Sequence, residues 1–505
     1  MAIEIVQVNS HVKIGRFPSF QSVTAAGGYP PLQSSTVAGG LPPPQPSPAS
    51  GGGQGGGGFA RSRYNDFANL GKLWLAAFLL FLSGTALATP QIQHWKTDNG
   101  VRVYFVENHD LPLLDVSVDF AAGGSRDTPQ KAGMAALTRR MLALGAGGLN
   151  EDAISKRMAD VGAALGGSFD PDRAGVSLRT LSSAREREQA LDVLARVIQQ
   201  PEFPDSVIQR EKNRIVAGIK EAETQPDYIA GKAFQSMLYG KHPYALQSGG
   251  EVATVSALAR KDLLDFYRAH YRSDNAQVAI IGDVTVAQAK AIVAQLTGKL
   301  PRGGGAATLP PVQPLAKAET RRIEHPASQS HILMGMPGIK RADPDYFPLF
   351  VGNYILGGGG FDSRLLEEVR QKRGLAYSTY SYFSPMKQEG PFQIGLQTKR
   401  DQAEQALAVV RETLRKYVAE GPTDAELKQA KDNLTGGFPL RIDSNKKILD
   451  YLVTIGFYGL PLTYLDEFIG KVEKVTAADI RDAFSRRVKP DVMATVLVAA
   501  DGPAK

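Results

Sequence analysis

The sequence contains no cysteine and only seven histidines among its 505 residues. Without cysteine the chain has no disulfide, no thiolate metal site and no cysteine nucleophile, although this absence says little about the compartment. The histidines are His11, His94, His109, His242, His270, His325 and His331. No two of them are one helical turn apart, and neither His-Glu-x-x-His nor His-x-x-Glu-His occurs. We therefore interpret each histidine as a surface or locally hydrogen-bonded residue and not as a metal ligand.

Strong charge asymmetry and long apolar runs are also missing. The net charge is +7, and basic and acidic residues are mixed along the chain, which indicates a solvated surface and no nucleic-acid partner. The glycine run Gly357–Gly360 lacks the Lys-Ser/Thr of a P-loop and the spacing of a dinucleotide-binding loop, which argues against a nucleotide ligand. The apolar run Leu73–Leu82 is short for a membrane span, which needs about 20 residues.

The first 88 residues differ in composition from the rest. Residues 1–58 include a Pro/Gly-rich stretch with little to bury, so we expect disorder there or a wrongly assigned translation start. Residues 59–88 place basic residues before the apolar run and small residues at 86–88, which is the order of a secretory signal peptide. This predicts a periplasmic protein without stable membrane insertion after cleavage. The alternative is an uncleaved anchor in the inner membrane.

From residue 89 onward, two halves follow one plan. Each begins with strands, continues with amphipathic helices and ends with a helix followed by an apolar strand, such as AQVAIIG and ATVLV. We expect an α+β fold of two homologous domains, 89–300 and 317–505, each a mostly antiparallel sheet with helices packed on one face. The Pro/Gly-rich residues 301–316 read as the linker. A cleft between the domains is the expected ligand site.

One candidate site is the segment GMAALTRRMLALG, residues 133–145. Its apolar residues fall at helical spacing and predict a core-facing stripe, with Asp127 or Thr128 as cap. Ala136 and Arg140 are one turn apart on an adjacent face, and Arg139 lies beside them. Arginine stays protonated and offers no lone pair, so this face binds no metal. The two arginines form either a solvated, ion-paired face or a charged wall of the cleft.

The second candidate site is GGGGFDSRLLEEVRQKRGLAYSTYSYF, which starts at Gly357. Ser363 is the expected cap of a helix that ends at Gly374, and an alternating strand follows. Arg370 in the last helical turn and Tyr377 just past the turn are expected to face the space beside this helix–strand corner. The alternative for Arg370 is a purely structural role, because cations suit the C-terminal end of a helix.

With these residues in view, the chain from 89 to 505 resembles the M16 family of zinc metallopeptidases, the pitrilysin and mitochondrial-processing-peptidase group, and its bacterial two-domain subunits in particular. GGSRDTPQKAGMAALTRRMLALG matches the family stretch that carries His-x-x-Glu-His. On this match Ala136 and Arg140 stand at the histidine positions and Arg139 at the glutamate base. The later helix EKNRIVAGIKEAETQPD places Glu211 at a family acid and Gly218 at the third zinc ligand. The resemblance therefore implies that this chain binds no zinc and cuts no peptide alone.

The resemblance also assigns roles to the second candidate site. FDSRLLEEVRQKRGLAYSTYS matches the stretch whose arginine holds the substrate backbone and whose tyrosine stabilises the oxyanion, here Arg370 and Tyr377. The glycines Gly357, Gly358, Gly359 and Gly360 resemble a substrate-contacting loop of non-catalytic subunits.

Together these matches favour a non-catalytic subunit of a heterodimeric zinc peptidase, which supplies Arg370 and Tyr377 in trans to a partner that carries Zn²⁺ and hydrolyses unfolded peptides. One alternative is a peptide-binding or scaffold protein without hydrolysis. Another is an enzyme that uses different zinc ligands.

Overall fold

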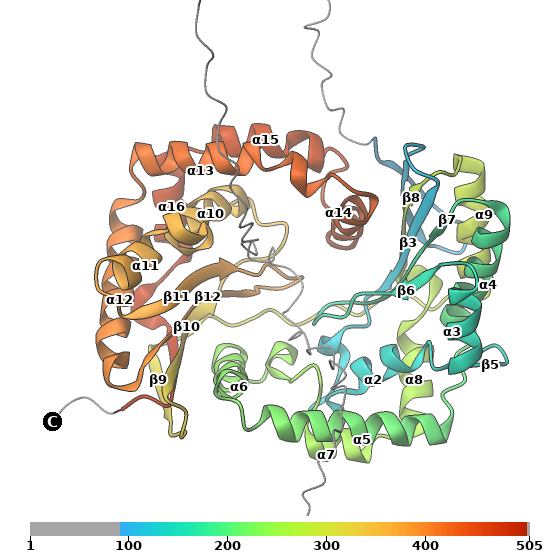
Figure 1. The fold of residues 1–505 in the computed structure, drawn as a ribbon, viewed down its shortest axis with the longest axis horizontal. Coiled ribbons are helices and arrows are strands. Elements are labelled where there is room, and N and C mark those ends of the chain that lie inside the picture. Colours follow the sequence, from blue (N-terminus) through green and yellow to red (C-terminus); the bar gives the residue numbers. More distant parts are fainter. Residues whose placement is uncertain (1–90, 502–505) are drawn as a thin grey trace, which may run out of the picture.

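The computed structural model of this protein describes residues 91–501. The low-complexity segment 1–58 and the signal peptide 59–88 lie outside the described residues. Two sheets, one in each half of the chain, stand at opposite sides of the molecule with helices around and between them (Figure 1). Within residues 91–501, no helix combines the length and the apolar character that a membrane crossing requires.

The first sheet has six strands in the order β1-β2-β8-β3-β7-β6, and only β2 and β8 run parallel. The strands are β1 (Gln93–Lys96), β2 (Arg102–Glu107), β3 (Leu113–Phe120), β6 (Ala164–Gly166), β7 (Ala174–Leu181) and β8 (Ala276–Gly282). All residues of β8 are buried, which requires cover on both faces of the sheet. A separate short hairpin pairs β4 (Gly145–Ala146) with β5 (Leu149–Asn150).

The helices of the first half pack mainly against one face of this sheet and, in the view of Figure 1, below it. They are α2 (Met134–Met141), α3 (Glu151–Ala159), α4 (Ala184–Gln199), α5 (Asp205–Ala222), α6 (Pro226–Tyr239), α7 (Val252–Ala257), α8 (Arg260–His270) and α9 (Val286–Thr297). Helices α4 and α9 pack on each other and on the strands, whereas α2 packs on α5 and α8 (Figure 1). Residues 301–318 contain neither helix nor strand and lead to the second half.

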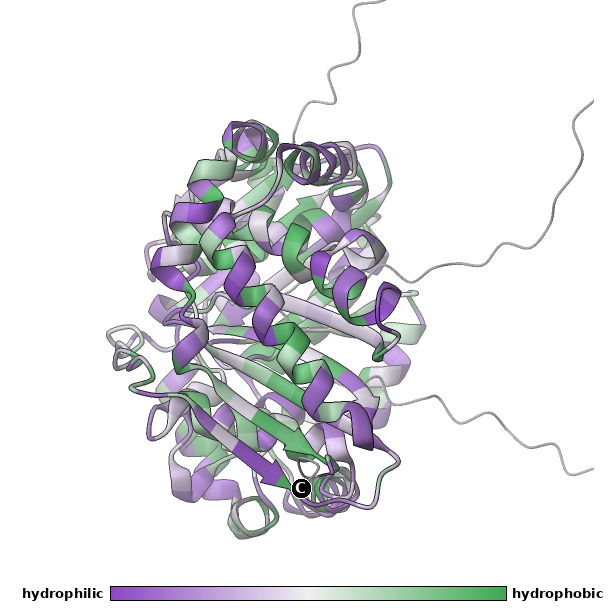
Figure 2. Ribbon diagram, turned by 90° about the vertical axis from the view of Figure 1, so that its left-hand side faces the viewer, coloured by the Kyte–Doolittle hydropathy of each residue, from purple (hydrophilic) through white to green (hydrophobic). Residues whose placement is uncertain are grey.

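The second sheet repeats the arrangement with five strands in the order β11-β12-β10-β13-β9, of which only β13 and β9 are parallel. The strands are β9 (Glu319–Ile323), β10 (Gln329–Pro337), β11 (Ala376–Phe383), β12 (Pro391–Lys399) and β13 (Ala494–Val498). The helices are α10 (Tyr346–Asn353), α11 (Arg364–Leu366), α12 (Ala403–Glu420), α13 (Asp424–Gly436), α14 (Asn445–Tyr458), α15 (Tyr464–Lys474) and α16 (Ala477–Arg487). In Figure 2 apolar stretches of these strands lie behind helices with mixed polar and apolar residues.

The two halves exchange one helix each. Helix α6 of the first half packs on β10 and β13 of the second sheet, where Phe234 joins a core cluster with Val496. Helix α14 of the second half packs on β2, β3 and β8, where Leu452 joins a cluster with Ile281. The prediction of two α+β halves with mostly antiparallel sheets is confirmed. The exchange adds a helix on the second face of each sheet, which explains why the central strands are buried on both sides.

Candidate functional site

Helix α2 forms the frame of the first candidate site. Both oxygens of the Asp127 carboxylate accept hydrogen bonds at the start of this helix, from the Gly133 N–H at 2.8 Å and the Ala135 N–H at 2.9 Å. Gly133 precedes the helix with φ of +90°, a conformation that favours glycine. The predicted apolar stripe is confirmed, since Met134, Leu137 and Met141 are buried in the first core cluster. The helix ends at Met141, and Gly145 already belongs to β4.

Arg139 is fixed by backbone carbonyls at the edge of the first sheet. Its Nε donates to the Gly175 carbonyl at 3.1 Å and its Nη2 to the Gly166 carbonyl at 2.9 Å. Burial lowers the pKa of the Arg139 guanidinium, and the neighbouring Arg140 charge acts in the same direction. An arginine remains protonated all the same. The side chain is therefore a positively charged group held in one orientation.

Arg140 is fixed by an ion pair with α5. Its Nε donates to the Glu211 carboxylate, whose side chain is 4% exposed, whereas that of Arg140 is 40% exposed. Arg210 donates to the other Glu211 oxygen at 3.1 Å. Burial alone raises the pKa of Glu211, but the hydrogen bonds and charges of Arg140 and Arg210 outweigh it and hold that pKa below its usual value. Of the two alternatives, the ion-paired face thus describes Arg140, but not Arg139.

The residues at the three expected zinc-ligand positions and at the position of the base do not fit zinc. A catalytic zinc needs three nitrogen or carboxylate ligands, but Ala136 offers a methyl group, Gly218 offers no side chain, and Arg139 and Arg140 are cations. A Cβ atom at Gly218 would have no other atom within 4 Å, so the position borders open space on α5. Among residues 91–501, no group of three or more acidic or histidine side chains is arranged to hold a metal ion.

The second candidate site lies at the corner between α11 and β11. The guanidinium carbon of Arg370 lies 4.9 Å from the centre of the Tyr377 ring, and Tyr377 is 82% exposed. The helix after Ser363 is shorter and less regular than expected, because α11 passes into a π-type turn at Glu367–Gln371. Ser363 stands at the cap position, but its hydroxyl donates to the Gly360 carbonyl at 2.8 Å instead of capping the helix. The structure thus places the Arg370 guanidinium over the ring of the exposed Tyr377, and the expected roles of the two residues stay predictions.

The glycine run has packing reasons for its composition. A Cβ at Gly357 would collide with Ser381 of β11, so only glycine allows this close approach. Gly360 has φ of +66° with open space around it. Gly358 and Gly359 are crowded by the preceding turn at residues 353–354. The run therefore seats the loop against β11, and its expected contact with substrate stays a prediction.

A cavity of about 520 Å³ that no sequence motif indicated lies between α6 and the second sheet. Its aromatic lining comes from both halves: Tyr228, Phe234, Tyr239, Tyr244, Tyr380 and Tyr382. The Tyr380 and Tyr382 rings stack in parallel with centres 5.9 Å apart, next to the unpaired edge of the second sheet. Burial raises the pKa of both hydroxyls, which keeps them protonated. Alternating tyrosines in LAYSTYSYF were the available signal, but the opposing helix comes from the other half.

Family models and related proteins that match this chain all belong to, or are named after, one group of peptidases and peptidase homologues. Residues 102–250 match the family model described as insulinase (peptidase family M16), and residues 257–434 match the model of the peptidase M16 inactive domain. The non-peptidase homolog YmxG of Helicobacter pylori is 26% identical over 412 residues, covering 81% of this chain and 93% of that protein. The uncharacterized zinc protease YmxG of Bacillus subtilis is 25% identical, covering 81% of this chain and 99% of its own length.

Solved structures show the same fold. A peptidase M16 inactive domain from Pseudomonas fluorescens is 37% identical with a TM-score of 0.79, covering 82% of this chain and 99% of that one. A protease from Helicobacter pylori has a TM-score of 0.75 over 81% of this chain and 100% of that one, and at 18% identity it supports the fold alone.

Proposed function

The chain belongs to peptidase family M16, and from this premise we propose that it is the non-catalytic subunit of a heterodimeric zinc peptidase. The partner would be a second M16 chain with an intact His-x-x-Glu-His motif, and the substrates would be unfolded peptides. The three zinc-ligand positions of this chain, Ala136, Arg140 and Gly218, carry no metal-binding side chain, and two similar proteins carry the descriptions inactive domain and non-peptidase homolog.

The observation that carries the proposal is the pair of the partly buried Arg370 and the exposed Tyr377. A tyrosine that is 82% exposed beneath a guanidinium contributes little to the core of its own chain. The same side chains are well placed to act on a molecule outside the chain. The pair therefore supports completion of an active site that belongs to another subunit.

The chemistry assigned to this pair is electrostatic. The Tyr377 hydroxyl would donate a hydrogen bond to the oxygen that becomes negative when the scissile carbonyl is attacked, and the Arg370 guanidinium would hold a peptide carbonyl in place. The partner's zinc would supply the activated water. A donor that is in place before the reaction stabilises the developing charge more than it stabilises the bound substrate.

The test is to co-purify this chain with a zinc-bearing M16 chain and to measure cleavage of short unstructured peptides. Cleavage should require both chains. Tyr377→Phe should lower kcat of the complex by about 10²–10³, because it removes one oxyanion donor. Arg370→Ala should lower kcat/KM through weaker substrate positioning.

Arg373→Ala is a matched control, since Arg373 lies in the same turn but pairs with Glu368 at 2.6 Å. It removes the same charge and should leave the kinetics unchanged. Full activity in the complex with both Arg370→Ala and Tyr377→Phe would overturn the role in trans. Cleavage by the lone chain with stoichiometric zinc would instead support an enzyme with different ligands.

A second candidate function is peptide binding without hydrolysis. The tyrosine-lined cavity beside the free edge of β11 favours it, because an extended peptide can add to a sheet edge and place a side chain in an adjoining pocket. A chain that binds peptides but forms no active complex with any M16 partner would support this function over the first.

We further propose that the protein acts in the periplasm after removal of a signal peptide within residues 59–88. The order of basic, apolar and small residues supports this location. Mass spectrometry of the exported chain checks it, since cleavage should leave an N-terminus close to residue 89. An intact N-terminus in the membrane fraction would instead indicate the anchored form.

A further inference from the structure

The degenerate zinc pocket presents arginine side chains that are held in place. Arg139 is fastened by two carbonyls of the first sheet, and Arg140 is fastened by the buried Glu211 carboxylate. Helices α2 and α5, which carry these groups, pack against each other. Surface arginines usually lose side-chain freedom when they bind a ligand, but these two have already lost much of it. The pocket is therefore preorganised.

The fixed arginines keep unused donors. Within residues 91–501, no protein group accepts a hydrogen bond from Nη1 or Nη2 of Arg140 or from Nη1 of Arg139, and both side chains are partly exposed. Ala136 and Gly218 fill little of the space that larger side chains would take, and the position of Gly218 borders open space. The site thus combines room with N–H groups of two planar guanidinium forks.

The charge of Arg139 is only partly compensated. Its hydrogen-bond partners are two carbonyls and no carboxylate. Asp119 acts on it through space, but the two Asp119 oxygens already accept hydrogen bonds from Ser117 and Ser168. The Arg140 charge repels that of Arg139. A bound anion close to these arginines would relieve this repulsion.

We propose that the part of α2 that carries Arg139 and Arg140, together with the facing side of α5, binds a carboxylate group of an unfolded peptide. A guanidinium fork matches the two oxygens of a carboxylate and binds it through parallel charge-assisted hydrogen bonds. The inference rests on the proposed function only in taking a peptide as the ligand. The carboxylate comes either from the peptide C-terminus or from an Asp or Glu side chain. The replacement of the zinc ligands has then exchanged a metal site for an anchor that holds peptide without cutting it.

The experiment measures binding of labelled peptides to the lone chain by fluorescence anisotropy. One neutral, unstructured peptide is made with a free C-terminal carboxylate and as the C-terminal amide, and the amide is also made with one internal Gln replaced by Glu. Each charge-assisted carboxylate contact should tighten binding about tenfold or more. Preference for the free acid identifies the C-terminus, and preference for the Glu amide identifies the side chain. Equal affinity for all three peptides overturns the proposal.

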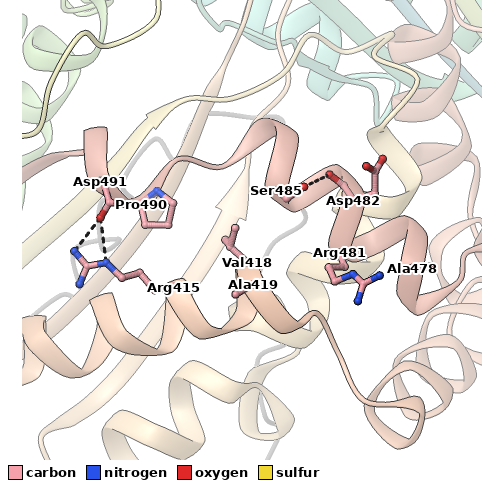
Figure 3. Close-up of a pocket in the computed structure, with 9 residues that line it drawn as sticks. All are labelled: Arg415, Val418, Ala419, Ala478, Arg481, Asp482, Ser485, Pro490 and Asp491. Carbon is pink, nitrogen blue, oxygen red and sulfur yellow. Dashed lines mark hydrogen bonds and ion pairs between the residues drawn. The ribbon is translucent and has the colours of Figure 1, made fainter.

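Conservative variants locate the carboxylate on the chain. Arg140→Lys keeps the charge and the partner of Glu211 but loses the fork, so the carboxylate preference should fall about tenfold. Arg139→Lys should act in the same direction. Arg415→Lys is the matched control, because Arg415 pairs with Asp491 on the outer surface of α12 (Figure 3). An unchanged preference in both site variants would overturn the assignment to this pocket.

The readout separates this inference from the proposed function. Because binding is measured without the partner, carboxylate-dependent binding together with an inactive complex would contradict only the heterodimeric peptidase. If the complex is active but the lone chain binds peptides equally well with and without a carboxylate, only the proposed carboxylate site is contradicted. If a variant fails to fold, which circular dichroism reports, the three peptides on the unaltered chain still decide the outcome.

Discussion

At the scale of single residues, the packing around α2 fixes the backbone at the positions that the family resemblance assigns to zinc ligands. The Asp127 cap, the buried stripe of α2 and the contact of α2 with α5 hold positions 136, 140 and 218 in place. Positions 136 and 140 are one helical turn apart, so their side chains share a face. The space beside Gly218 has room for a longer side chain.

This geometry predicts that four substitutions rebuild a zinc site. The variant Ala136→His, Arg139→Glu, Arg140→His and Gly218→Glu should bind one zinc per chain after dialysis, measured by elemental mass spectrometry. The matched variant that leaves Gly218 unchanged lacks the third ligand and should bind zinc much more weakly. The fourfold variant should also lose the carboxylate preference. A folded fourfold variant without zinc would mean that α2 and α5 no longer hold the ligand geometry.

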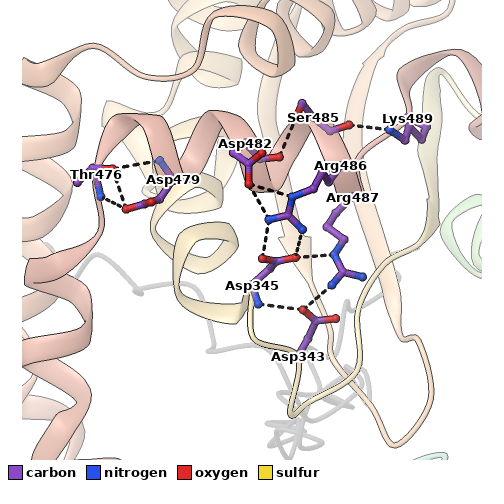
Figure 4. Close-up of polar contacts among 9 residues, drawn as sticks. All are labelled: Asp343, Asp345, Thr476, Asp479, Asp482, Ser485, Arg486, Arg487 and Lys489. Atoms are coloured by element: carbon purple, nitrogen blue, oxygen red, sulfur yellow. Dashed lines mark hydrogen bonds and ion pairs between the residues drawn. The ribbon is translucent and has the colours of Figure 1, made fainter.

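At the scale of elements, ion pairs fasten the start of α10 to the end of α16. The Asp345 carboxylate accepts hydrogen bonds from Arg486 at 2.7 and 2.8 Å and from Arg487 at 2.6 Å, and Arg487 also donates to Asp343 (Figure 4). The hydrogen bond from Arg486 is the main cause that lowers the pKa of Asp345 to about 2, and burial opposes it. The two arginines lie in the last turn of α16, where cations also suit the helix dipole.

These pairs predict a pH dependence of stability. The pKa of Asp345 is lower in the folded chain than its unfolded value of about 3.9, so its stabilisation is complete above about pH 4 and is lost as the pH falls toward 2. Asp345→Asn should lower the free energy of unfolding at pH 7 by about 1 kcal/mol, since the arginines are partly in solvent. Urea titrations at pH 7 and pH 3 measure this, and the difference between variant and wild type should shrink at pH 3.

Asp482→Asn is the control for this prediction. Asp482 pairs with Arg486 as well, but its side chain is 64% exposed, so its removal should change the stability very little. A loss from Asp345→Asn that stays the same at both pH values would assign the effect to packing instead of charge.

Some helices and strands could be predicted from local sequence patterns, whereas their packing partners could not. The stripe of α2 follows local periodicity, which side-chain burial enforces, so it could be predicted. The strand β11 could also be predicted, but not the register shift between Ala376 and Thr379 that interrupts its alternation. The sequence indicated Asp127 as a capping residue of α2, but not its distance from the helix. Its carboxylate accepts a hydrogen bond from the Gly133 N–H, six residues further along the chain. Phe234 and Leu452 belong to amphipathic helices, but no local pattern says that each helix packs on the sheet of the other half. The tyrosine-lined cavity depends on that exchange and escaped prediction with it.

At the scale of the whole molecule, the two halves are joined by a buried polar centre. The Asp172 carboxylate of the first half accepts hydrogen bonds from Tyr244 at 2.5 Å, from Tyr458 of α14 at 3.0 Å and from the Lys387 N–H of the second half at 2.7 Å. Asp172 is buried, so losing one of these partners would leave an unpaired polar group away from water. Each half therefore needs the other for its second sheet face and for this centre.

This interdependence predicts that the two halves unfold together. In the chain that begins at residue 89, Trp95 of β1 is the sole tryptophan and reports on the first half. Phe468→Ala removes a fully buried ring from the core of the second half, where it stacks on Phe438, and should cost about 3–5 kcal/mol. The exposed Leu440→Ala is the control and should change the stability by less than about 0.5 kcal/mol. With cooperative halves, Phe468→Ala shifts the urea midpoint of Trp95 fluorescence as far as that of the circular dichroism signal, because both probes follow one transition. With independent halves, the Trp95 transition would stay where it is and the circular dichroism curve would split into two steps.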